Sequence, residues 1–443
     1  MSNKILVLGA GLVAGPLVKY LLDQPDFEVI VADIIAEKAE SLIGSHSRGE
    51  SLVLDSRNDA NLEKAVPVVD LVVSLLPFTF HPKVAGLCLR HKKNMVTASY
   101  VNPQIQAMDK DARQAGITIL NEVGLDPGID HMEAMRIIDK LKADEVKIKS
   151  FRSFCGGLPA PEACDNPWNY KFSWSPLGVL HASKSAAVYL ERSKIFEISS
   201  DDLFDSCREI KIEGLGVFEG YPNRNSLPYI KLYGIDSVET MLRGTLRYPG
   251  WCQTMKYVIR LGLLDEEIRD FSGMTYEGLM RALLKIPESQ EVKEFMSTFL
   301  EIPLDSEILH KLEWLGLWND DVIPIKRGTA MEVLSDRMYA RMSYRSGERD
   351  MIVLQHEFIY SRQDGRQEKI ISSLVDYGIP DQDSSMARTV GLPAAIGTRL
   401  ILEGKVKEKG VIIPVKQELY GPILKELENQ GISFVTKQIP VNS

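Results

Sequence analysis

The feature that most constrains the fold is a glycine-rich loop between an apolar strand and an amphipathic helix. The apolar run at 4–8 predicts a buried strand, and apolar residues recur at helical spacing over 17–22. Between them, Gly9, Gly11 and Ala14 have the spacing of a dinucleotide-binding loop. Such a loop brings backbone close to a pyrophosphate at a helix N-terminus. The predicted cofactor-binding residues here are Gly9, Ala10, Gly11, Leu12 and Val13.

A carboxylate after the second predicted strand indicates which dinucleotide to expect. The strand at 28–32 ends in Asp33, about 20 residues beyond the loop, where a carboxylate can bind the adenosine ribose. The same charge would repel a 2′-phosphate, and no arginine follows at 34–36. The sequence therefore predicts NAD rather than NADP as cofactor. The alternative interpretation of Asp33 is a solvated strand end.

Strands and helices continue to alternate along the first part of the chain. Further strands are predicted at 51–54, 70–76, 94–98 and 117–121, with helical patterns between them. This alternation is typical of an α/β fold with a Rossmann-type, doubly wound parallel sheet. Ligands bind beyond the carboxyl ends of such strands. The residues expected at those ends include Leu76, Ser99, Tyr100, Leu125 and Asp126.

The pattern changes near residue 147 to strands separated by longer loops, which predicts an α+β substrate domain. A chain of 443 residues is also too long for one ordinary core. We expect a Rossmann domain at 1–125, joined by C-terminal helices from 386–443. The substrate domain is expected at 126–250 and 322–385, with a helical insertion at 251–321.

Composition excludes several functional classes. The net charge of -9 gives no reason to expect a nucleic-acid partner, and no apolar run is long enough to cross a membrane. The five cysteines are scattered without a Cys-x-x-Cys pair, so no metal site is predicted. Without a recognisable signal peptide, we expect a soluble protein of the cytoplasm.

The segment at 121–131, Asn-Glu-Val-Gly-Leu-Asp-Pro-Gly-Ile-Asp-His, is more distinctive than the glycine loop. It resembles the signature that closes the Rossmann domain in glutamate-forming saccharopine dehydrogenases. The resemblance covers nearly the whole chain. It is carried by further blocks at 74–77, 97–100, 153–161, 166–175, 221–226 and 243–248.

This resemblance implies the oxidation of a secondary amine. Saccharopine, water and an oxidised nicotinamide would give L-glutamate and 2-aminoadipate 6-semialdehyde. Fungal biosynthetic members of the family use NADP and carry an arginine after the second strand, where this sequence has Asp33. We therefore expect an NAD-linked, catabolic enzyme of lysine breakdown. The resemblance also implies a homodimer.

The implied substrate carries three carboxylates, so its site should present fixed cations. Arginine matches a carboxylate with two parallel hydrogen bonds. Arg243 is a candidate that could equally point into water. The resemblance places substrate contacts at Ser99, Tyr100, Asp126, Arg224, Thr245, Leu246 and Arg247.

Hydride can leave only from a carbon whose nitrogen holds a lone pair, so a base must first deprotonate the secondary ammonium. Asp126 is the preferred candidate, although Asp-Pro-Gly is also a strong turn sequence. Tyr100 and Cys155 are further catalytic candidates. His131 is as consistent with a cap or an interface as with catalysis.

Lys171 and Trp174 are candidates to close over the cofactor, although aromatic residues in such a block are more often core. Two other functions stay open. One is a related carboxyamine dehydrogenase, such as a spermidine-forming enzyme. The other is a non-catalytic, nucleotide-sensing protein on the same scaffold.

Overall fold

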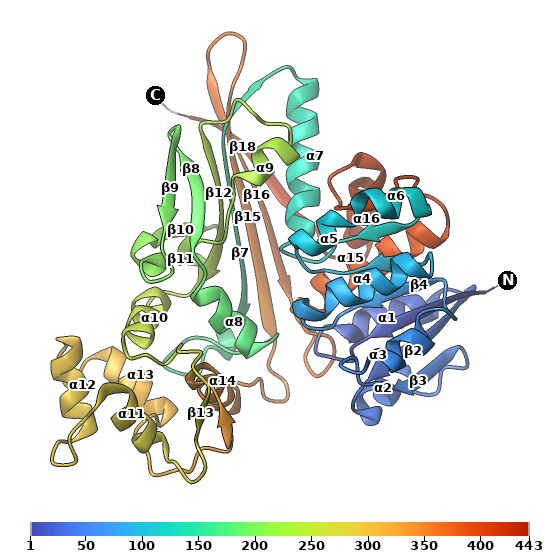
Figure 1. Ribbon diagram of the computed structural model, residues 1–443. Coiled ribbons are helices and arrows are strands. Elements are labelled where there is room, and N and C mark those ends of the chain that lie inside the picture. Colours follow the sequence, from blue (N-terminus) through green and yellow to red (C-terminus); the bar gives the residue numbers. More distant parts are fainter. Residues whose placement is uncertain (1, 442–443) are drawn as a thin grey trace. The chain divides into compact units, whose positions relative to one another are not determined.

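The computed structural model describes residues 2–441, which form two compact units. Of the described residues, unit 1 comprises those up to Ile148, Leu232–Gly234 and those from Tyr360 onward, and unit 2 comprises Lys149–Lys231 and Ile235–Ile359. Unit 1 thus combines the N-terminal and C-terminal parts of the chain (Figure 1).

The elements of unit 1 begin with five strand–helix repeats around the glycine loop. They are, in order, β1 (Asn3–Leu8), α1 (Ala14–Asp23), β2 (Phe27–Asp33), α2 (Ala36–Ile43), β3 (Gly49–Val53), α3 (Asp59–Ala65), β4 (Leu71–Ser74), η1 (Phe78–Phe80), α4 (His81–Arg90), β5 (Asn94–Val96), α5 (Pro103–Ala107), α6 (Asp109–Ala115), β6 (Thr118–Leu120) and α7 (Ile129–Ala143). The C-terminal part adds β16 (Gln367–Tyr377), α15 (Ser385–Leu402), β17 (Gly410–Ile412), α16 (Gln417–Asn429) and β18 (Val435–Pro440).

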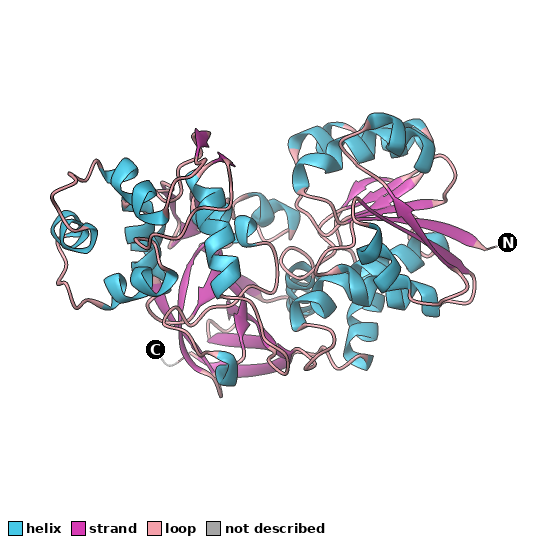
Figure 2. Ribbon diagram, turned by 90° about the horizontal axis from the view of Figure 1, so that it is seen from below, coloured by secondary structure: helices cyan, strands magenta, loops and turns pink. Residues whose placement is uncertain are grey.

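A seven-stranded sheet forms the centre of unit 1, in the order β17-β6-β5-β4-β1-β2-β3. All of its pairings are parallel. The strand order reverses at β1, so the glycine loop lies at the switch point where such sheets bind dinucleotides. Helices cover both faces of the sheet (Figure 2). This confirms the predicted α/β, Rossmann-type architecture.

Each face of the parallel sheet is buried, as expected for strands that are connected by crossover helices. On one face Leu6 and Val72 pack in a cluster with Leu62 of α3, Val84 of α4 and Ala112 of α6. The other face carries α1 and α15, which pack together. Gly391 of α15 permits this approach, because a Cβ there would lie 2.9 Å from Val13 O.

Unit 2 is a mixed α/β structure with most of its helices in the second half. Its elements are β7 (Lys147–Pro159), η2 (Pro161–Ala163), α8 (Pro176–Ser183), β8 (Ala187–Glu191), β9 (Lys194–Ile198), η3 (Leu203–Ser206), β10 (Arg208–Ile212), β11 (Gly216–Pro222), α9 (Pro228–Leu232), β12 (Thr240–Arg247), α10 (Trp251–Arg260), β13 (Arg269–Asp270), α11 (Tyr276–Leu284), α12 (Val292–Leu300), α13 (Glu307–Leu315), β14 (Arg327–Gly328), α14 (Ala330–Arg341) and β15 (Asp350–Ser361).

The sheet of unit 2 contains both parallel and antiparallel pairs. Its strands run in the order β10-β11-β12-β7-β15, with β8 paired to β12 and β9. Strand β12 is parallel to β7 and antiparallel to β11. This mixed sheet confirms the α+β architecture that the sequence predicts for the second part of the chain.

The units differ in extent from the domains expected from sequence. Unit 1 reaches Ile148 and resumes at Tyr360, whereas the sequence placed the Rossmann domain at 1–125 and 386–443. Helix α7 extends unit 1 because it packs against α16. The helices at 251–321 belong to unit 2. Among residues 2–441, no helix is both long and apolar enough to cross a membrane.

Candidate functional site

The glycine loop has the shape that a dinucleotide requires. Gly9 N donates to Ala32 O at 2.8 Å, and a Cβ on Gly9 would lie 3.2 Å from Leu75 O at a φ of +102°. A Cβ on Gly11 would meet no other atom within 4 Å, so the backbone is open on that side. Helix α1 begins at Ala14 without a side-chain cap or an acidic residue in its first turn. Its N–H groups therefore fit a diphosphate.

Asp33 is bonded to this loop through both carboxylate oxygens. Oδ2 accepts a hydrogen bond from Ala10 N at 2.8 Å, and Oδ1 accepts one from Ile35 N at 3.0 Å. The side chain thus holds the glycine loop against the end of β2. This role does not depend on which dinucleotide binds.

A buried histidine connects two strand ends in unit 1. His81 begins α4 and is 1% exposed. Its Nδ1 is 3.0 Å from Ser74 Oγ, and its Nε2 is 2.8 Å from Ser99 Oγ. Burial lowers the pKa of His81 to about 4, so its ring is neutral at neutral pH. The ring therefore fixes Ser99, which the sequence assigned to both cofactor and substrate.

Tyr100 and Asp126 lie together after β5 and β6, as their positions at strand ends predicted. The Tyr100 hydroxyl donates to Asp126 Oδ1 at 3.1 Å, and both residues are half-buried. The Asp126-Pro127 peptide bond is cis. A carboxylate that accepts this hydrogen bond through one oxygen is held in place and can take a proton on the other, which is what a base in this position needs.

His131 is fully buried and makes contacts through both ring nitrogens. Its Nε2 is 2.7 Å from Glu122 Oε2, and its Nδ1 is 2.6 Å from the Tyr233 hydroxyl. Glu122 Oε1 also accepts a hydrogen bond from Val101 N at 3.0 Å. This network ties the end of β6 to the segment that follows Tyr100 and to α7.

Arg247 is a deeply buried arginine of unit 2. It is 4% exposed, and its guanidinium lies 5.1 Å from the ring centroid of Tyr170 and 5.3 Å from that of Trp251. Its Nη1 donates to Leu246 O at 2.8 Å, whereas its Nε has no hydrogen-bond partner. Within residues 2–441, no carboxylate forms an ion pair with Arg247. Burying such a cation is unfavourable unless an anion joins it.

The other predicted substrate residues of unit 2 lie near Arg247 in the sheet. Thr245, Leu246 and Arg247 form the end of β12, where Thr245 pairs with Cys155 of β7 and with Tyr221 of β11. Arg243 is 3% exposed, with its guanidinium 4.3 Å from the ring centroid of Tyr229. Arg243 therefore does not point into water.

The remaining predicted residues are distributed over both units. Arg224 has a left-handed φ of +55°, and its carbonyl accepts Val188 N at 2.9 Å. Lys171 pairs with Glu348 at 2.6 Å and with Asp165 at 2.8 Å, which binds it within unit 2. Half-buried Trp174 lies against the start of α8, where a Cβ on Gly178 would be 2.7 Å from its ring. Leu76 and Leu125 follow β4 and β6 in unit 1.

Sequence reasoning missed His81 and the link between Glu122 and His131. His81 stood only as the first residue of a predicted helix, and nothing local indicated its contact with Ser99. Position at the carboxyl edge of the sheet was the one signal that could have found it.

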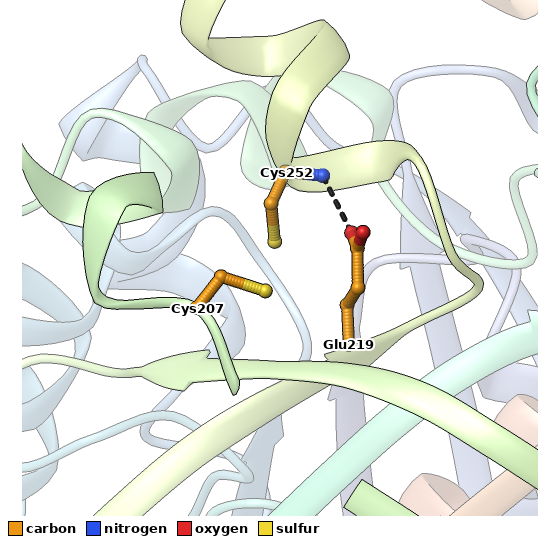
Figure 3. A group of neighbouring side chains, drawn as sticks. All are labelled: Cys207, Glu219 and Cys252. Atoms are coloured by element: carbon orange, nitrogen blue, oxygen red, sulfur yellow. Dashed lines mark hydrogen bonds between the residues drawn. The ribbon is translucent and has the colours of Figure 1, made fainter. Parts of the chain in front are cut away.

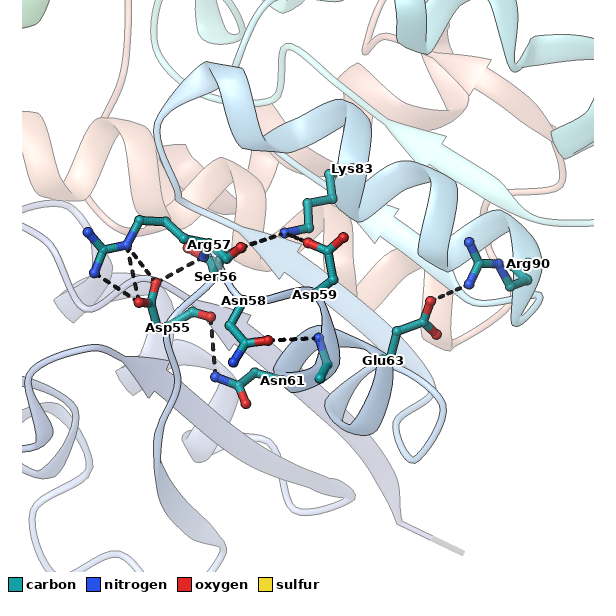
Figure 4. Close-up of polar contacts among 10 residues, drawn as sticks. Asp55, Ser56, Arg57, Asn58, Asp59, Asn61, Glu63, Lys83 and Arg90 are labelled. Carbon is teal, nitrogen blue, oxygen red and sulfur yellow. Dashed lines mark hydrogen bonds and ion pairs between the residues drawn. The ribbon is translucent and has the colours of Figure 1, made fainter.

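Unit 1 has a surface pocket of about 280 Å³ that none of the predicted site residues lines. It lies between α3 and α4, and its lining consists of Asp59, Glu63, Pro82, Lys83, Gly86, Leu87 and Arg90. Figure 4 shows the polar contacts here, including the ion pair between Arg57 and Asp55 at 2.8 Å. Lys83 holds the same loop by donating to Ser56 O at 2.9 Å.

Comparison with known families and proteins identifies relatives over nearly the whole chain. Residues 5–120 match a family model described as the saccharopine dehydrogenase NADP binding domain, and residues 124–432 match the saccharopine dehydrogenase C-terminal domain. The chain is 39% identical to the NADP(+), L-glutamate-forming saccharopine dehydrogenase of Saccharomyces cerevisiae, covering 99% of this chain and 100% of the relative.

A solved structure and a longer relative extend these findings. The apo, histidine-tagged saccharopine dehydrogenase (L-Glu forming) of Saccharomyces cerevisiae has a TM-score of 0.88 and 38% identity, covering 99% of this chain and 100% of that chain. The mitochondrial alpha-aminoadipic semialdehyde synthase of Bos taurus is 39% identical over 98% of this chain. The chain spans about half of that relative, 48% of its length.

These findings contradict the prediction of NAD as cofactor. The matching N-terminal family model is an NADP binding domain, and the relatives from Saccharomyces cerevisiae, Pyricularia oryzae and Schizosaccharomyces pombe are named as NADP(+) enzymes. The prediction relied on Asp33 as a ribose ligand that excludes a phosphate. Both oxygens of Asp33 instead accept backbone N–H groups, so its presence at this position is explained without a ribose.

Proposed function

The chain belongs to the saccharopine dehydrogenase family, and from this premise we propose that it oxidises saccharopine with NADP to L-glutamate and 2-aminoadipate 6-semialdehyde. The proposal makes the protein an oxidoreductase acting on a carbon–nitrogen bond in lysine metabolism. Its support comes from the family, from the glycine loop of unit 1 and from the buried cations of unit 2.

The observation that carries the proposal is the buried guanidinium of Arg247. Burial, the largest single influence, lowers the pKa of Arg247, but the combined electrostatic influence of Tyr221, Tyr170, Cys252 and Cys155 leaves the pKa raised. The group is therefore a permanent cation. A substrate carboxylate would supply the anion that the described chain does not, through a charge-assisted hydrogen bond from Nε. Saccharopine carries three carboxylates, so it fits a site that contains such a cation.

The groups of unit 1 would carry the proton transfer. Asp126 takes the proton from the secondary ammonium of saccharopine, which leaves a lone pair on nitrogen. Tyr100 holds Asp126 in place through its hydroxyl. NADP, when bound at the glycine loop, would supply the acceptor for the hydride that leaves the carbon destined to become the semialdehyde. Water then adds to the resulting imine, and the carbon–nitrogen bond breaks to release L-glutamate.

Arg57 is the residue proposed to contact the 2′-phosphate of NADP. A phosphate near Asp33 needs a cation, since the carboxylate would otherwise repel it. Strand β3 pairs with β2, with Val53 opposite Asp33, and it is followed by the loop that carries Arg57. Arg57 is exposed, so it can exchange its partner Asp55 for a phosphate.

Three finer points have different bases: the homodimer was inferred from the family resemblance, the cytoplasmic location from the lack of a recognisable signal peptide, and the catabolic direction from Asp33. A catabolic direction, a homodimer and a cytoplasmic location stay predictions. Sedimentation of the purified protein tests the homodimer, and rates in both directions test the catalytic preference.

Initial rates of NADP reduction with saccharopine test the proposed function, with NAD measured in parallel. We expect saccharopine-dependent formation of NADPH, with L-glutamate released in equal amount. Spermidine serves as a control amine without carboxylates and should give no reduction. If NADPH binds but neither nucleotide is reduced with saccharopine, the proposal is wrong and the scaffold has another function.

A further inference from the structure

Three side chains of unit 2 that lie far apart in the sequence converge at the start of α10. Cys207 lies between η3 and β10, Glu219 lies in β11, and Cys252 is in the first turn of α10. Their sulfur and carboxylate oxygen atoms all lie within 4.8 Å of one another. Figure 3 shows both thiols and the carboxylate facing the same small space.

Glu219 keeps acceptor capacity although it already caps the helix. One of its oxygens accepts Gly250 N at 2.7 Å, and the other accepts Cys252 N at 2.8 Å. A carboxylate oxygen can accept a second interaction, so each oxygen retains a free lone pair. Within residues 2–441, Glu219 forms no ion pair with a lysine or arginine. The half-buried carboxylate therefore has no direct ion-pair partner beside the two thiols, and the nearest cation that acts on it is the buried Lys311.

We propose that Cys207, Glu219 and Cys252 bind a thiophilic divalent cation such as Zn²⁺. Two thiolates and one carboxylate are ligands that Zn²⁺ accepts, and a water molecule would complete a tetrahedral site. Zinc–sulfur bonds of about 2.3 Å place two sulfurs about 3.8 Å apart in that geometry. The donors therefore need to approach by no more than about 1 Å, which side-chain rotation can supply.

The composition of the group favours a metal over a disulfide. A disulfide would require the two sulfurs to reach about 2.05 Å, and it would not use the remaining acceptor capacity of Glu219. A thiophilic cation engages all three groups and neutralises most of their negative charge. Bound metal would tie the loop before β10, strand β11 and helix α10 together. It is a structural site in unit 2 and is independent of the proposed dehydrogenase activity.

Cobalt titration of untagged, chelator-treated protein tests this site. Co²⁺ bound by thiolates gives a sulfur-to-metal charge-transfer absorption, and Zn²⁺ should displace it at one equivalent per chain. The Cys207→Ser and Cys252→Ser variants should bind at least roughly 10-fold more weakly and lose that absorption. Cys164→Ser is the matched control, because Cys164 is a half-buried thiol of the same unit outside the group.

A second measurement separates metal binding from a folding defect. Zn²⁺ should raise the unfolding temperature of the native chain and of Cys164→Ser, but not of Cys207→Ser. Without metal, all three proteins should unfold at similar temperatures. The proposal is overturned if no charge-transfer band appears or if Cys207→Ser keeps the band at native affinity. The proposal is also overturned if mild peroxide oxidises Cys207 and Cys252 to a disulfide, seen as the loss of two free thiols, and the protein takes up no metal.

Discussion

The Tyr100 hydroxyl donates a 3.1 Å hydrogen bond to Asp126 Oδ1, which joins the ends of two neighbouring strands of the parallel sheet. The two residues follow β5 and β6, and both are half-buried. The pair combines a proton acceptor with a group that orients it. This is the arrangement expected of a general base at the carboxyl edge of a Rossmann sheet.

Replacing Asp126 with Asn should lower kcat for saccharopine oxidation by about 100-fold or more, because the amide cannot accept the ammonium proton. Tyr100→Phe keeps the carboxylate and removes only its hydrogen bond, so its loss should be smaller. The measurement is the pH dependence of kcat for both variants. An Asp126→Asn enzyme that retained native kcat and the acid limb of the profile would refute the assignment.

Arg247→Met should raise the KM for saccharopine by at least about 30-fold, equivalent to about 2 kcal/mol. The same change should leave thermal stability unchanged or higher, because it removes a buried cation that no carboxylate of the described chain neutralises. Steady-state kinetics and thermal unfolding of one preparation measure both effects. A fall in stability with native KM would assign Arg247 a purely structural role.

Arg152→Met is the matched control for that experiment. Arg152 is also a partly buried arginine of unit 2, but it pairs with Glu191 at 3.1 Å and Glu357 at 3.0 Å. Its removal should cost up to about 1 kcal/mol of stability and leave KM unchanged. The Arg247→Met change should therefore raise KM without lowering stability, whereas the Arg152→Met change should lower stability without changing KM.

His81 should make the protein less stable in mild acid. Its pKa is about 4 in the folded protein and 6.5 for an ordinary solvated histidine, so between these values the unfolded chain binds more protons. The stabilisation is complete above pH 6.5 and is lost as pH falls toward 4. At pH 5 the loss should be about 2 kcal/mol.

Urea unfolding of the native protein and of His81→Gln measures this contribution. Glutamine can still hydrogen-bond Ser74 and Ser99 but does not titrate. Between pH 7.5 and pH 5 the variant should lose about 2 kcal/mol less stability than the native chain. Equal losses in both proteins would show that His81 titrates normally in the folded state.

Local patterns were sufficient to predict most of the parallel sheet, because each strand has an apolar run followed by a helix. They could not predict β17, a strand of three residues that pairs with β6. This edge depends on contacts between distant segments, such as Thr118 Oγ1 donating to Glu408 O across 290 residues. Long-range pairing of so short a strand leaves no local signal.

In the candidate site too, contacts between segments far apart in the sequence could not be predicted. Asp126 and Tyr100 could be placed together because both follow strands in one sheet. The aromatic surroundings of Arg247 combine Tyr170 and Trp251 from separate segments, so its burial could not be inferred. Asp33 misled the cofactor prediction because a carboxylate that closes the glycine loop has the same sequence position as one that binds a ribose.

Arg57 and Asp33 should therefore have separable effects on cofactor binding. Arg57→Ala should raise the KM for NADP by roughly 10-fold, since it removes a charged contact to the 2′-phosphate. NAD has no such phosphate, so its KM should not change. Asp33→Ala should weaken both nucleotides, because Ala10 N and Ile35 N lose their acceptor and the loop loses its attachment to β2.

The matched control for Arg57 is Arg90→Ala. Arg90 is another exposed arginine of unit 1, and it pairs with Glu63 between α3 and α4, away from the strand ends (Figure 4). The Arg90→Ala change should leave both KM values at the native level. A change in either KM would reveal a general effect of surface charge. If Arg57→Ala weakened NADP and NAD equally, the residue would act by supporting the loop after β3. The cation that neutralises the phosphate beside Asp33 would then have to come from another part of the protein.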